Sequence, residues 1–385
     1  MTLSADLKTT IKRSALWHNG RQIKELVGEK VSSRLLTVKS LEESFPELSR
    51  QILPFDYTPI STLEALEMPF LPQCQHLRQS TYQIPLAFSS AICGIKHCAN
   101  ENTLLDQKGN IIAESSNTYT QSKYFKWSSY LRKKEERIEG SATLLRSASF
   151  RPFNDYYHVL IDNLPRLFAF FAQNFNLQED IKLIAIEKIT PLEDFFLKRL
   201  EIPGLEIHVL PKDRIYSYDK YLFSSFLTRQ FSGYIPSEYL SFFTEKVLPH
   251  RPRKKDTRIY ISRSQAGRRR IKNEEEVLKL LGTYGFQTYH FETMSIEDQI
   301  EVMYDADAVI APHGAGLANI IFCNGSKVLE LFGIREIKPN YYYLSKSCNC
   351  PYDYLCFPNC THINEDFLVN IDTLRHKVED FIERG

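Results

Sequence analysis

The sequence lacks an excess of charge of one sign. Its 48 lysines and arginines stand against 47 acidic residues, which gives a formal net charge of +1 over 385 residues. Proteins that bind DNA or RNA through a strong general field carry a clear basic excess. The composition therefore excludes a globally basic nucleic-acid-binding protein, and any basic site must be local.

The first thirty residues lack a long apolar run. Charged residues are spread through MTLSADLKTTIKRSALWHNGRQIKELVGEK, so no stretch has the length of a signal-peptide core or a membrane span. Low-complexity segments and internal repeats are missing as well. We therefore expect a globular, cytoplasmic protein. Peripheral association with the inner face of the membrane is compatible with that expectation.

Paired Cys-x-x-Cys knuckles, which are typical of structural zinc sites, are also missing. The eight cysteines include a late cluster of Cys348, Cys350, Cys356 and Cys360, which is followed by His362. The Cys-x-Cys and Cys-x-x-x-Cys spacings of this cluster do not reproduce the knuckles. We expect free thiols, some of them buried, and no metal site.

What the sequence does have is enough apolar material for two cores. With 385 residues and 43% hydrophobic content, the chain is too long for one ordinary core. We place the boundary just before the basic segment 250–258 and predict domains at 1–245 and 246–385.

Apolar runs on both sides of Asp-Gln-Lys-Gly-Asn (106–110) predict a hairpin, and with it an antiparallel β region early in the first domain.

Strand and helix patterns then alternate in both domains. Residues 157–168 show helical spacing, and Pro165 should kink or restart that helix. Alternation of this kind predicts an α/β fold with a parallel, doubly wound sheet, and the last segment, 364–385, predicts an amphipathic helix that packs back across the domains. The predicted strands are 141–149, 181–186, 205–210, 257–262, 286–291, 307–312 and 327–332.

Polar side chains gather at the carboxyl ends of three predicted strands in the second domain. Arg263 ends the first strand, His313 and Gly314 follow the third, and Glu330 lies within the fourth. Ligands of open parallel sheets bind at such ends, where arginine and a helix N-terminus suit a diphosphate and a carboxylate suits ribose hydroxyls. The candidate donor-binding residues are Arg263, Arg268, His313, Gly314, Ala315, Gly316, Asn319 and Glu330.

These residues also have structural interpretations. The arginines 268–270 could form a solvated loop, and His313 could be a hydrogen-bonded structural imidazole. Burying Glu330 unpaired between Leu329 and Leu331 would cost several kcal/mol, on the order of the desolvation of a polar group, so this carboxylate needs a partner.

A second cluster lies in the first domain, within FNDYYHVLIDNLPRLF (153–168). His158 and Asp162 are four residues apart, which places both side chains on one face of a helix. The pair could act as a base toward an acceptor hydroxyl, or it could be a helix-stabilising hydrogen bond. Asp162 is our first choice for the base and His158 our second. Asn154 and Tyr157 are the candidates for acceptor binding.

Four stretches together resemble glycosyltransferase family 61. They are FNDYYHVLIDNLPRLF, YISRSQAGRRRIKNEEEVLKLL, APHGAGLANIIFC and SKVLELF, and their order and spacing match the family over roughly 140–345. Val159 departs from the pattern, because the family commonly has tryptophan there. An aromatic acceptor platform is therefore not expected at this position.

The resemblance implies a GT-B-like fold, in which two Rossmann-like domains face a cleft. It places a nucleotide-sugar donor on the C-terminal domain and a glycan or lipid-linked glycan acceptor on the N-terminal one. Members of the family invert the anomeric centre without an essential metal. Independently, the only Asp-x-Asp near a donor-site strand, Asp305 to Asp307, lies at the amino end of that strand, so arginines must supply the cations.

We therefore expect an inverting, metal-independent glycosyltransferase without a cofactor, which uses a UDP-sugar to build a surface or capsular polysaccharide. Two other classes stay open. A non-catalytic sugar- or nucleotide-binding protein would bind nucleotide without transfer. A nucleic-acid-binding protein would use the basic stretch 251–272, which has few aromatic residues to stack bases.

Overall fold

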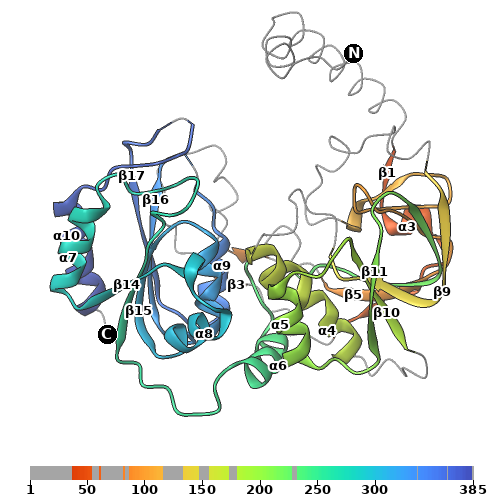
Figure 1. Cartoon of the computed structure of the whole chain (residues 1–385), viewed down its shortest axis with the longest axis horizontal. Coiled ribbons are helices and arrows are strands. Elements are labelled where there is room, and N and C mark those ends of the chain that lie inside the picture. The colour runs from red at the N-terminus through yellow and green to blue at the C-terminus, as the bar shows by residue number, and fades with distance from the viewer. Residues whose placement is uncertain are drawn as a thin grey trace, which may run out of the picture.

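A computed structural model describes residues 37–53, 60–61, 81–82, 86–115, 133–146, 156–172, 180–227, 232–335, 337–361 and 363–383. The chain is a mixed α/β protein with two main sheets, one in each half (Figure 1). The predicted α/β class is confirmed at this level. No helix in the described ranges is long and apolar enough to cross a membrane.

The second half contains a five-stranded, fully parallel sheet in the order β14-β13-β15-β16-β17. The predicted strands of this domain are confirmed, and β17 was not predicted. Because β13 has β14 on one side and β15 on the other, the strand order reverses between β13 and β15. The strands are β13 (Thr257–Ile261), β14 (Phe286–Tyr289), β15 (Ala306–Pro312), β16 (Lys327–Gly333) and β17 (Tyr352–Phe357).

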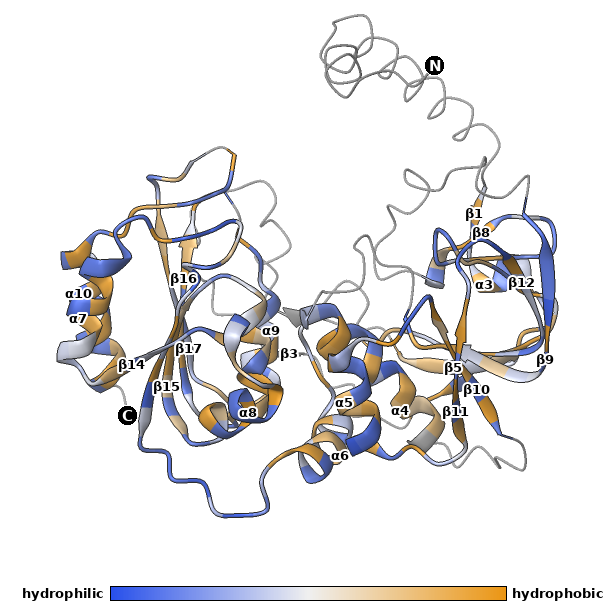
Figure 2. Cartoon of the chain, in the orientation of Figure 1, coloured by the Kyte–Doolittle hydropathy of each residue, from blue (hydrophilic) through white to orange (hydrophobic). Residues whose placement is uncertain are grey.

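Helices cover both faces of this sheet, as doubly wound sheets require. Figure 1 shows α7 and α10 on one face and α8 and α9 on the face toward the first half. Figure 2 shows hydrophobic strands between helices that alternate apolar and polar residues. The segments are α7 (Glu274–Thr283), the 3-10 turn η7 (Phe291–Thr293), α8 (Ile296–Tyr304), the 3-10 helix η8 (Ala315–Phe322), α9 (Asn340–Ser347) and α10 (Ile371–Glu383).

The C-terminal helix corrects one expectation. We predicted that it packs back across both domains, whereas α10 contacts α7 and buries Leu374, Val378 and Phe381 in the core on that outer face of the second sheet. The apolar side of α7 lies in this core, and the apolar side of α10 packs against it.

The first half departs from a Rossmann-like domain. Its ten-stranded sheet is mixed, with the order β1-β8-β7-β6-β12-β9-β10-β11 and with β5 and β2 attached beside β12. Only the neighbours β12, β9, β10 and β11 and the pair β1–β8 run parallel, and the predicted hairpin is β7 and β8. Of the two main sheets, the fully parallel arrangement that we expected in both halves is present only in the second.

The strands of the first half are short except for β9 and β12. They are β1 (Val38–Lys39), β2 (Gln51–Ile52), β5 (Phe88–Ile92), β6 (Lys96–Cys98), β7 (Thr103–Leu105), β8 (Ile111–Ile112), β9 (Glu135–Leu144), β10 (Ile181–Ile186), β11 (Leu205–Leu210) and β12 (Ile215–Ser224), and the separate pair β3 (Ile60–Ser61) and β4 (Thr81–Tyr82). The helical segments are α3 (Leu41–Ser44), η2 (Ala113–Ser115), the π-helix η5 (His158–Asn163), α4 (Leu164–Ala172), α5 (Pro191–Leu200) and α6 (Ser237–Val247).

The two halves share one apolar core. Phe322 of η8 stacks on Phe196 of α5 and on Phe243 of α6, with ring centroids 6.3 and 6.1 Å apart. Figure 1 shows α4, α5 and α6 between the first sheet and the second half. The chain passes from α6 to β13 through 248–256, so the predicted boundary at 245/246 falls two residues before the end of α6 at Val247. Because the halves pack together here, the candidate residues of the first half and those of the second face one another across the contact between the halves.

We expect acid to destabilise the first half through His97. This side chain is fully buried, its Nε2 lies 2.9 Å from Asn102 Oδ1, and burial lowers its pKa to about 4. As the pH falls from about 6.5 to about 4, the unfolded chain binds a proton here and the folded chain does not, so up to about 3 kcal/mol of stability present at pH 7 is lost.

Urea unfolding of the wild type and His97→Gln at neutral pH and near pH 4 would measure this loss. The variant should be less stable at pH 7 but should lose less stability on acidification. His376→Gln, at an exposed position of α10, is the control and should follow the wild type. Equal losses in the wild type and His97→Gln would contradict the prediction.

Candidate active site

A pocket of about 170 Å³ lies at the carboxyl ends of β13 and β15, where the strand order reverses. Open parallel sheets bind their ligands at this switch point. Arg263 follows β13, Ala315 and Gly316 begin η8, and Tyr156 reaches the pocket from the first half. The remaining lining residues are Ile261, Ser262, Phe291, Glu292, Gln299, Ala311, Pro312, Leu317 and Asn319.

Arg263 is held against the turn that follows β15. Its Nη2 donates to the carbonyl of Arg268 over 3.1 Å, and its buried Nε has no hydrogen-bond partner. The guanidinium lies so close to Gly314 that a Cβ there would be 1.8 Å from Arg263 Nη1. Gly314 has an extended backbone with φ of 173°, so glycine is needed for the space and not for the conformation.

Positive charge is concentrated around this turn. Burial and then the charge of Arg269 lower the pKa of Arg263, and burial and the charges of Arg269, Lys338, Arg263 and Arg268 lower the pKa of His313. Burial is the larger cause of both pKa shifts, and the repulsion by neighbouring cations adds to it. An anionic ligand would relieve that repulsion, and the first N–H groups of η8 lack partners in their own helix.

His313 and Glu330 lie behind this surface instead of in it. His313 is buried, with its Nδ1 2.5 Å from Glu330 Oε1, and the pKa of His313 is well below its usual range, so the imidazole is neutral at pH 7. Glu330 is 0% exposed, Tyr352 donates to its other oxygen over 2.6 Å, and burial raises its pKa. The expected partner of Glu330 is confirmed.

This arrangement corrects the predicted role of Glu330. A ribose contact needs an accessible carboxylate oxygen, and both oxygens of Glu330 are engaged inside the protein. His313 fits the alternative of a hydrogen-bonded structural imidazole, and its ring stacks on Phe332 at 5.2 Å. The turn therefore offers backbone groups of Ala315 and Gly316 to the pocket, and the His313 side chain supports the turn from behind.

Asn319 joins the two halves at the pocket wall. It is fully buried, its Nδ2 donates to the Gly316 carbonyl over 2.9 Å, and its Oδ1 accepts from Tyr156 over 2.6 Å. The predicted donor-binding residue thus fixes the position of Tyr156. Arg268 is also occupied, because its side chain lies 3.4 Å from Glu365 while its carbonyl holds Arg263.

Tyr156 leads directly into the segment with the His158 and Asp162 pair. The predicted spacing is confirmed, because His158 Nδ1 bonds to Asp162 Oδ2 across one turn. A carboxylate only accepts, so Nδ1 carries the proton and the other ring nitrogen, Nε2, is the basic one. The His158 side chain is 34% exposed and that of Asp162 7%, so His158 is the more accessible member of the pair.

Local backbone structure explains how the pair is presented. The turn His158–Asn163 is a π-helix, and α4 begins at Leu164 beside Pro165, where the predicted restart occurs. Proline lacks an N–H and cannot continue the helical ladder, and π turns within helices often mark functional sites. Val159 is buried in the core and offers no platform for an acceptor.

A hydrogen-bond chain connects this pair with the second half. Ser232 Oγ donates to Asp162 Oδ1 over 2.7 Å, and Ser232 Oγ and Tyr157 O–H are 3.0 Å apart. Because the serine proton goes to the carboxylate, Tyr157 donates to Ser232, and Asn340 of α9 donates to Tyr157 over 2.9 Å. Tyr157 thus supports Asp162 from inside, which differs from the predicted acceptor contact. Asn154 lies outside the described residues.

Ring contacts bring the two candidate clusters close together. Tyr157 contacts His158 on one side at 5.3 Å and Tyr341 on the other at 5.6 Å, and Tyr341 contacts His313 at 5.3 Å. Residues of both halves that were proposed from separate motifs therefore lie close together in the structure.

Several of these residues were not found from the sequence. They are Tyr156, Ser232, Tyr341 and Tyr352. Tyr156 sits next to a residue that was chosen, and the tyrosine run at 341–343 was a visible signal. Ser232 carries no recognisable pattern and is identified only by its contact with Asp162.

The remaining polar motifs have structural partners. Arg251 binds Asp305 and Glu301, and Arg253 donates to carbonyls around the start of β15, so these arginines of the basic stretch 251–272 are used internally. Asp305 precedes β15, at its amino end as predicted. The nucleic-acid alternative thus loses part of its basic surface.

The late cysteine cluster consists of free thiols. Cys348 and Cys350 are buried, and Cys356 and Cys360 are partly exposed. His362 lies outside the described residues. Within the described part of the chain, His, Cys, Asp and Glu form no group of three or more that could hold a metal ion.

Fold and site together define an α/β protein that can hold an anionic ligand at a sheet switch point beside a His-carboxylate pair. Residues 156–329 match the sequence model of the family described as Glycosyltransferase 61. The matched region begins at Tyr156 and contains every described candidate residue except Glu330. A search of curated proteins gave no match. The match supports the resemblance seen in the sequence and, with it, a glycosyltransferase that uses a sugar donor and a glycan acceptor.

Proposed function

We propose that this protein transfers a sugar from a nucleoside diphosphate donor, UDP-linked, to a hydroxyl of a glycan or lipid-linked glycan, with inversion at the anomeric carbon. The acceptor is an intermediate of a surface or capsular polysaccharide, and the reaction takes place in the cytoplasm or at the inner face of the membrane. The supporting observation is the shared pocket, which Arg263 lines from one half and Tyr156, two residues before His158, from the other.

The proposed step uses one proton transfer and one displacement. His158 Nε2 takes the proton of the acceptor hydroxyl while its oxygen attacks the anomeric carbon, and the bond from that carbon to the diphosphate oxygen breaks. Arg263 and the first N–H groups of η8 stabilise the negative charge on the leaving diphosphate. Asp162 holds Nδ1–H and stabilises the imidazolium that forms.

This assignment reverses our first choice from the sequence, because His158 is now the base and Asp162 orients it. Asp162 is nearly buried and accepts from both His158 and Ser232, so it suits an orienting group. His158 is the more exposed of the two, so it suits the group that meets the acceptor hydroxyl.

Calorimetry with UDP, GDP, dTDP and uridine would test the donor site, followed by a transfer assay with UDP-sugars. We expect UDP to bind more tightly than uridine, because the cations around Arg263 recognise the diphosphate. No binding of any nucleoside diphosphate would contradict the proposal. Binding of UDP without hydrolysis or transfer over a broad acceptor panel would favour the non-catalytic binding protein.

We also predict that activity survives chelation. Arg263, with Arg268, Arg269 and Lys338 close enough to affect its surroundings, supplies the positive charge that a metal ion provides in other transferases. Transfer measured in excess EDTA should stay within about twofold of the rate with Mg²⁺ or Mn²⁺. Complete loss in EDTA that Mn²⁺ or Mg²⁺ restores would show that the arginines do not fill this role.

A further inference from the structure

The carboxylate of Asp162 accepts hydrogen bonds from two separate parts of the chain. His158 Nδ1 lies in the same helical segment, η5, whereas Ser232 Oγ donates over 2.7 Å from the segment that precedes α6. The Asp162 side chain is 7% exposed, so its direction is set by protein donors more than by water. Whatever places Ser232 therefore also places the carboxylate that holds His158.

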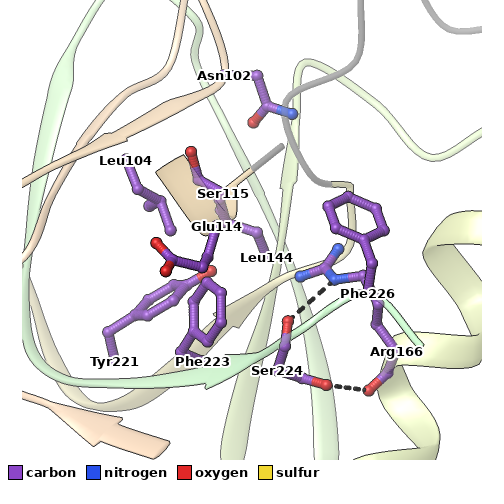
Figure 3. A pocket seen from close by; sticks show the side chains of 10 residues that line it. All are labelled: Asn102, Leu104, Glu114, Ser115, Leu144, Arg166, Tyr221, Phe223, Ser224 and Phe226. Carbon is purple, nitrogen blue, oxygen red and sulfur yellow. Dashed lines mark hydrogen bonds between the residues drawn. The ribbon is translucent and has the colours of Figure 1, made fainter. Parts of the chain in front are cut away.

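The helix that carries the pair is fixed to the sheet of the first half. Arg166 of α4 donates from Nε to the Ser224 carbonyl over 3.3 Å, and Ser224 Oγ donates back to the Arg166 carbonyl over 2.8 Å (Figure 3). Burial lowers the pKa of Arg166, and attraction to the nearby Asp162 opposes that shift. The same attraction favours the ionised form of Asp162. On this side, the pair is held entirely within the first half.

Ser232, in contrast, is held by α9 of the second half. Asn340 begins α9, and its Nδ2 donates to the Ser232 carbonyl over 3.1 Å. At the other end of α9, Ser347 Oγ accepts from the Ile235 N–H over 2.7 Å. Gly233 lies so close to α9 that an added Cβ would be 2.1 Å from the Asn340 carbonyl oxygen. The second half therefore fixes the position of this segment.

The Asn340 side chain also holds Tyr157. Its Nδ2 donates to the Tyr157 hydroxyl over 2.9 Å, and that hydroxyl lies 3.0 Å from Ser232 Oγ. The hydrogen bonds then run in one direction, from Asn340 through Tyr157 and Ser232 to the carboxylate of Asp162. Donors arranged in this way polarise one another, so each strengthens the next. One amide of the second half thus bonds to both residues that lead to Asp162.

We propose that Asn340 is a positioning residue for the base and acts across the contact between the halves, through Tyr157 and Ser232. This inference rests on the proposed function, in which His158 takes the proton of the acceptor hydroxyl. The second half, which binds the donor diphosphate, then also sets the direction of the base on the first half. Loss of the contact with α9 would leave His158 and Asp162 in place but without a fixed orientation.

Transfer rates of three variants test this role. Ser232→Ala removes a hydrogen bond to a charged group, so kcat should fall at least about tenfold, while UDP affinity stays unchanged. Asn340→Ala acts at a greater distance and should lower kcat about three- to tenfold. Ser232→Thr keeps the hydroxyl and should retain most of the rate. Ser237→Ala, which removes an exposed hydroxyl at the start of α6, is the matched control and should equal the wild type.

The same changes in a His158→Ala background separate positioning from general damage. A residue that acts only through the imidazole has nothing left to position there, so neither Ser232→Ala nor Asn340→Ala should lower the residual rate further. A further loss of the same size in that background would overturn the proposal. Wild-type kcat in both single variants would overturn it as well.

A measurement without substrate keeps this inference distinct from the proposed function. At about pH 9, where imidazole is neutral, the nitrogen NMR shifts of His158 in isotopically labelled protein report which ring nitrogen carries the proton. The proton should be on Nδ1 in the wild type, and partly on Nε2 in Ser232→Ala and Asn340→Ala. The wild-type pattern in both variants would overturn the positioning role. A wild type that transfers no sugar would contradict only the proposed function, because the tautomer can still be measured.

Discussion

His158→Ala is expected to reduce glycosyl transfer by two to four orders of magnitude, which is the usual contribution of general-base catalysis. The side chain is 34% exposed and lies outside the fully buried core, so its removal should leave the fold intact. UDP affinity should hardly change, because Arg263 and the η8 turn bind the diphosphate from the other half. Initial rates with a saturating UDP-sugar, together with calorimetry, would measure both quantities.

The matched control is His376→Ala, which removes an exposed histidine of α10. Its rate and melting temperature should equal those of the wild type. A normal transfer rate in His158→Ala with an unchanged melting temperature would exclude His158 as the base, and the search would return to Asp162.

The pH profile separates the two members of the pair. If His158 is the base, the rate should fall on acidification through the range in which imidazoles titrate, about pH 6–7. If Asp162 is the base, Asp162→Asn should abolish transfer at every pH, because the proton acceptor is gone. Asp162→Asn removes the carboxylate that orients the ring, so it should lower the rate while the acidic limb remains imidazole-like.

The sequence predicted those parts of the fold and site that depend on local periodicity. Alternating patterns located the strands of the second sheet, the four-residue spacing placed His158 and Asp162 on one face, and Pro165 marked the start of α4. The need for a partner at Glu330 followed from the cost of burying a charge. Each of these inferences uses only near neighbours in the chain.

The features that the sequence did not reveal are long-range contacts. The hydrogen bond from Ser232 to Asp162 joins residues seventy positions apart, and it underlies the proposed exchange of roles between His158 and Asp162. We assigned Glu330 to ribose because the sequence places it near the carboxyl end of a strand. The sequence does not show that His313, after β15, and Tyr352, on β17, bind its two carboxylate oxygens. Short strands in the first half pair antiparallel beside parallel ones, and a two-residue strand such as β8 is too short to show any periodicity.

At the donor site, Arg263→Ala should weaken UDP binding by about 10- to 100-fold, because a hydrogen bond to a charged group contributes about 1.5–3 kcal/mol. Uridine, which lacks phosphate, should bind the variant and the wild type alike. Calorimetry with both ligands measures the difference. Equal loss for uridine and UDP would place Arg263 at the nucleoside instead of the diphosphate.

Gly314→Ala should reproduce this loss without touching the arginine. The new methyl group would lie 1.8 Å from Arg263 Nη1, so the flexible guanidinium must move away, while the extended backbone accepts alanine without strain. Gly267→Ala, in the loop after β13 with no heavy atom within 4 Å of the added Cβ, is the matched control and should bind UDP normally. Because both changes act through one contact, the double variant should be no weaker than Arg263→Ala alone. Additive losses in the double variant would mean that Gly314 serves the ligand through its own backbone and not through the space it leaves for Arg263.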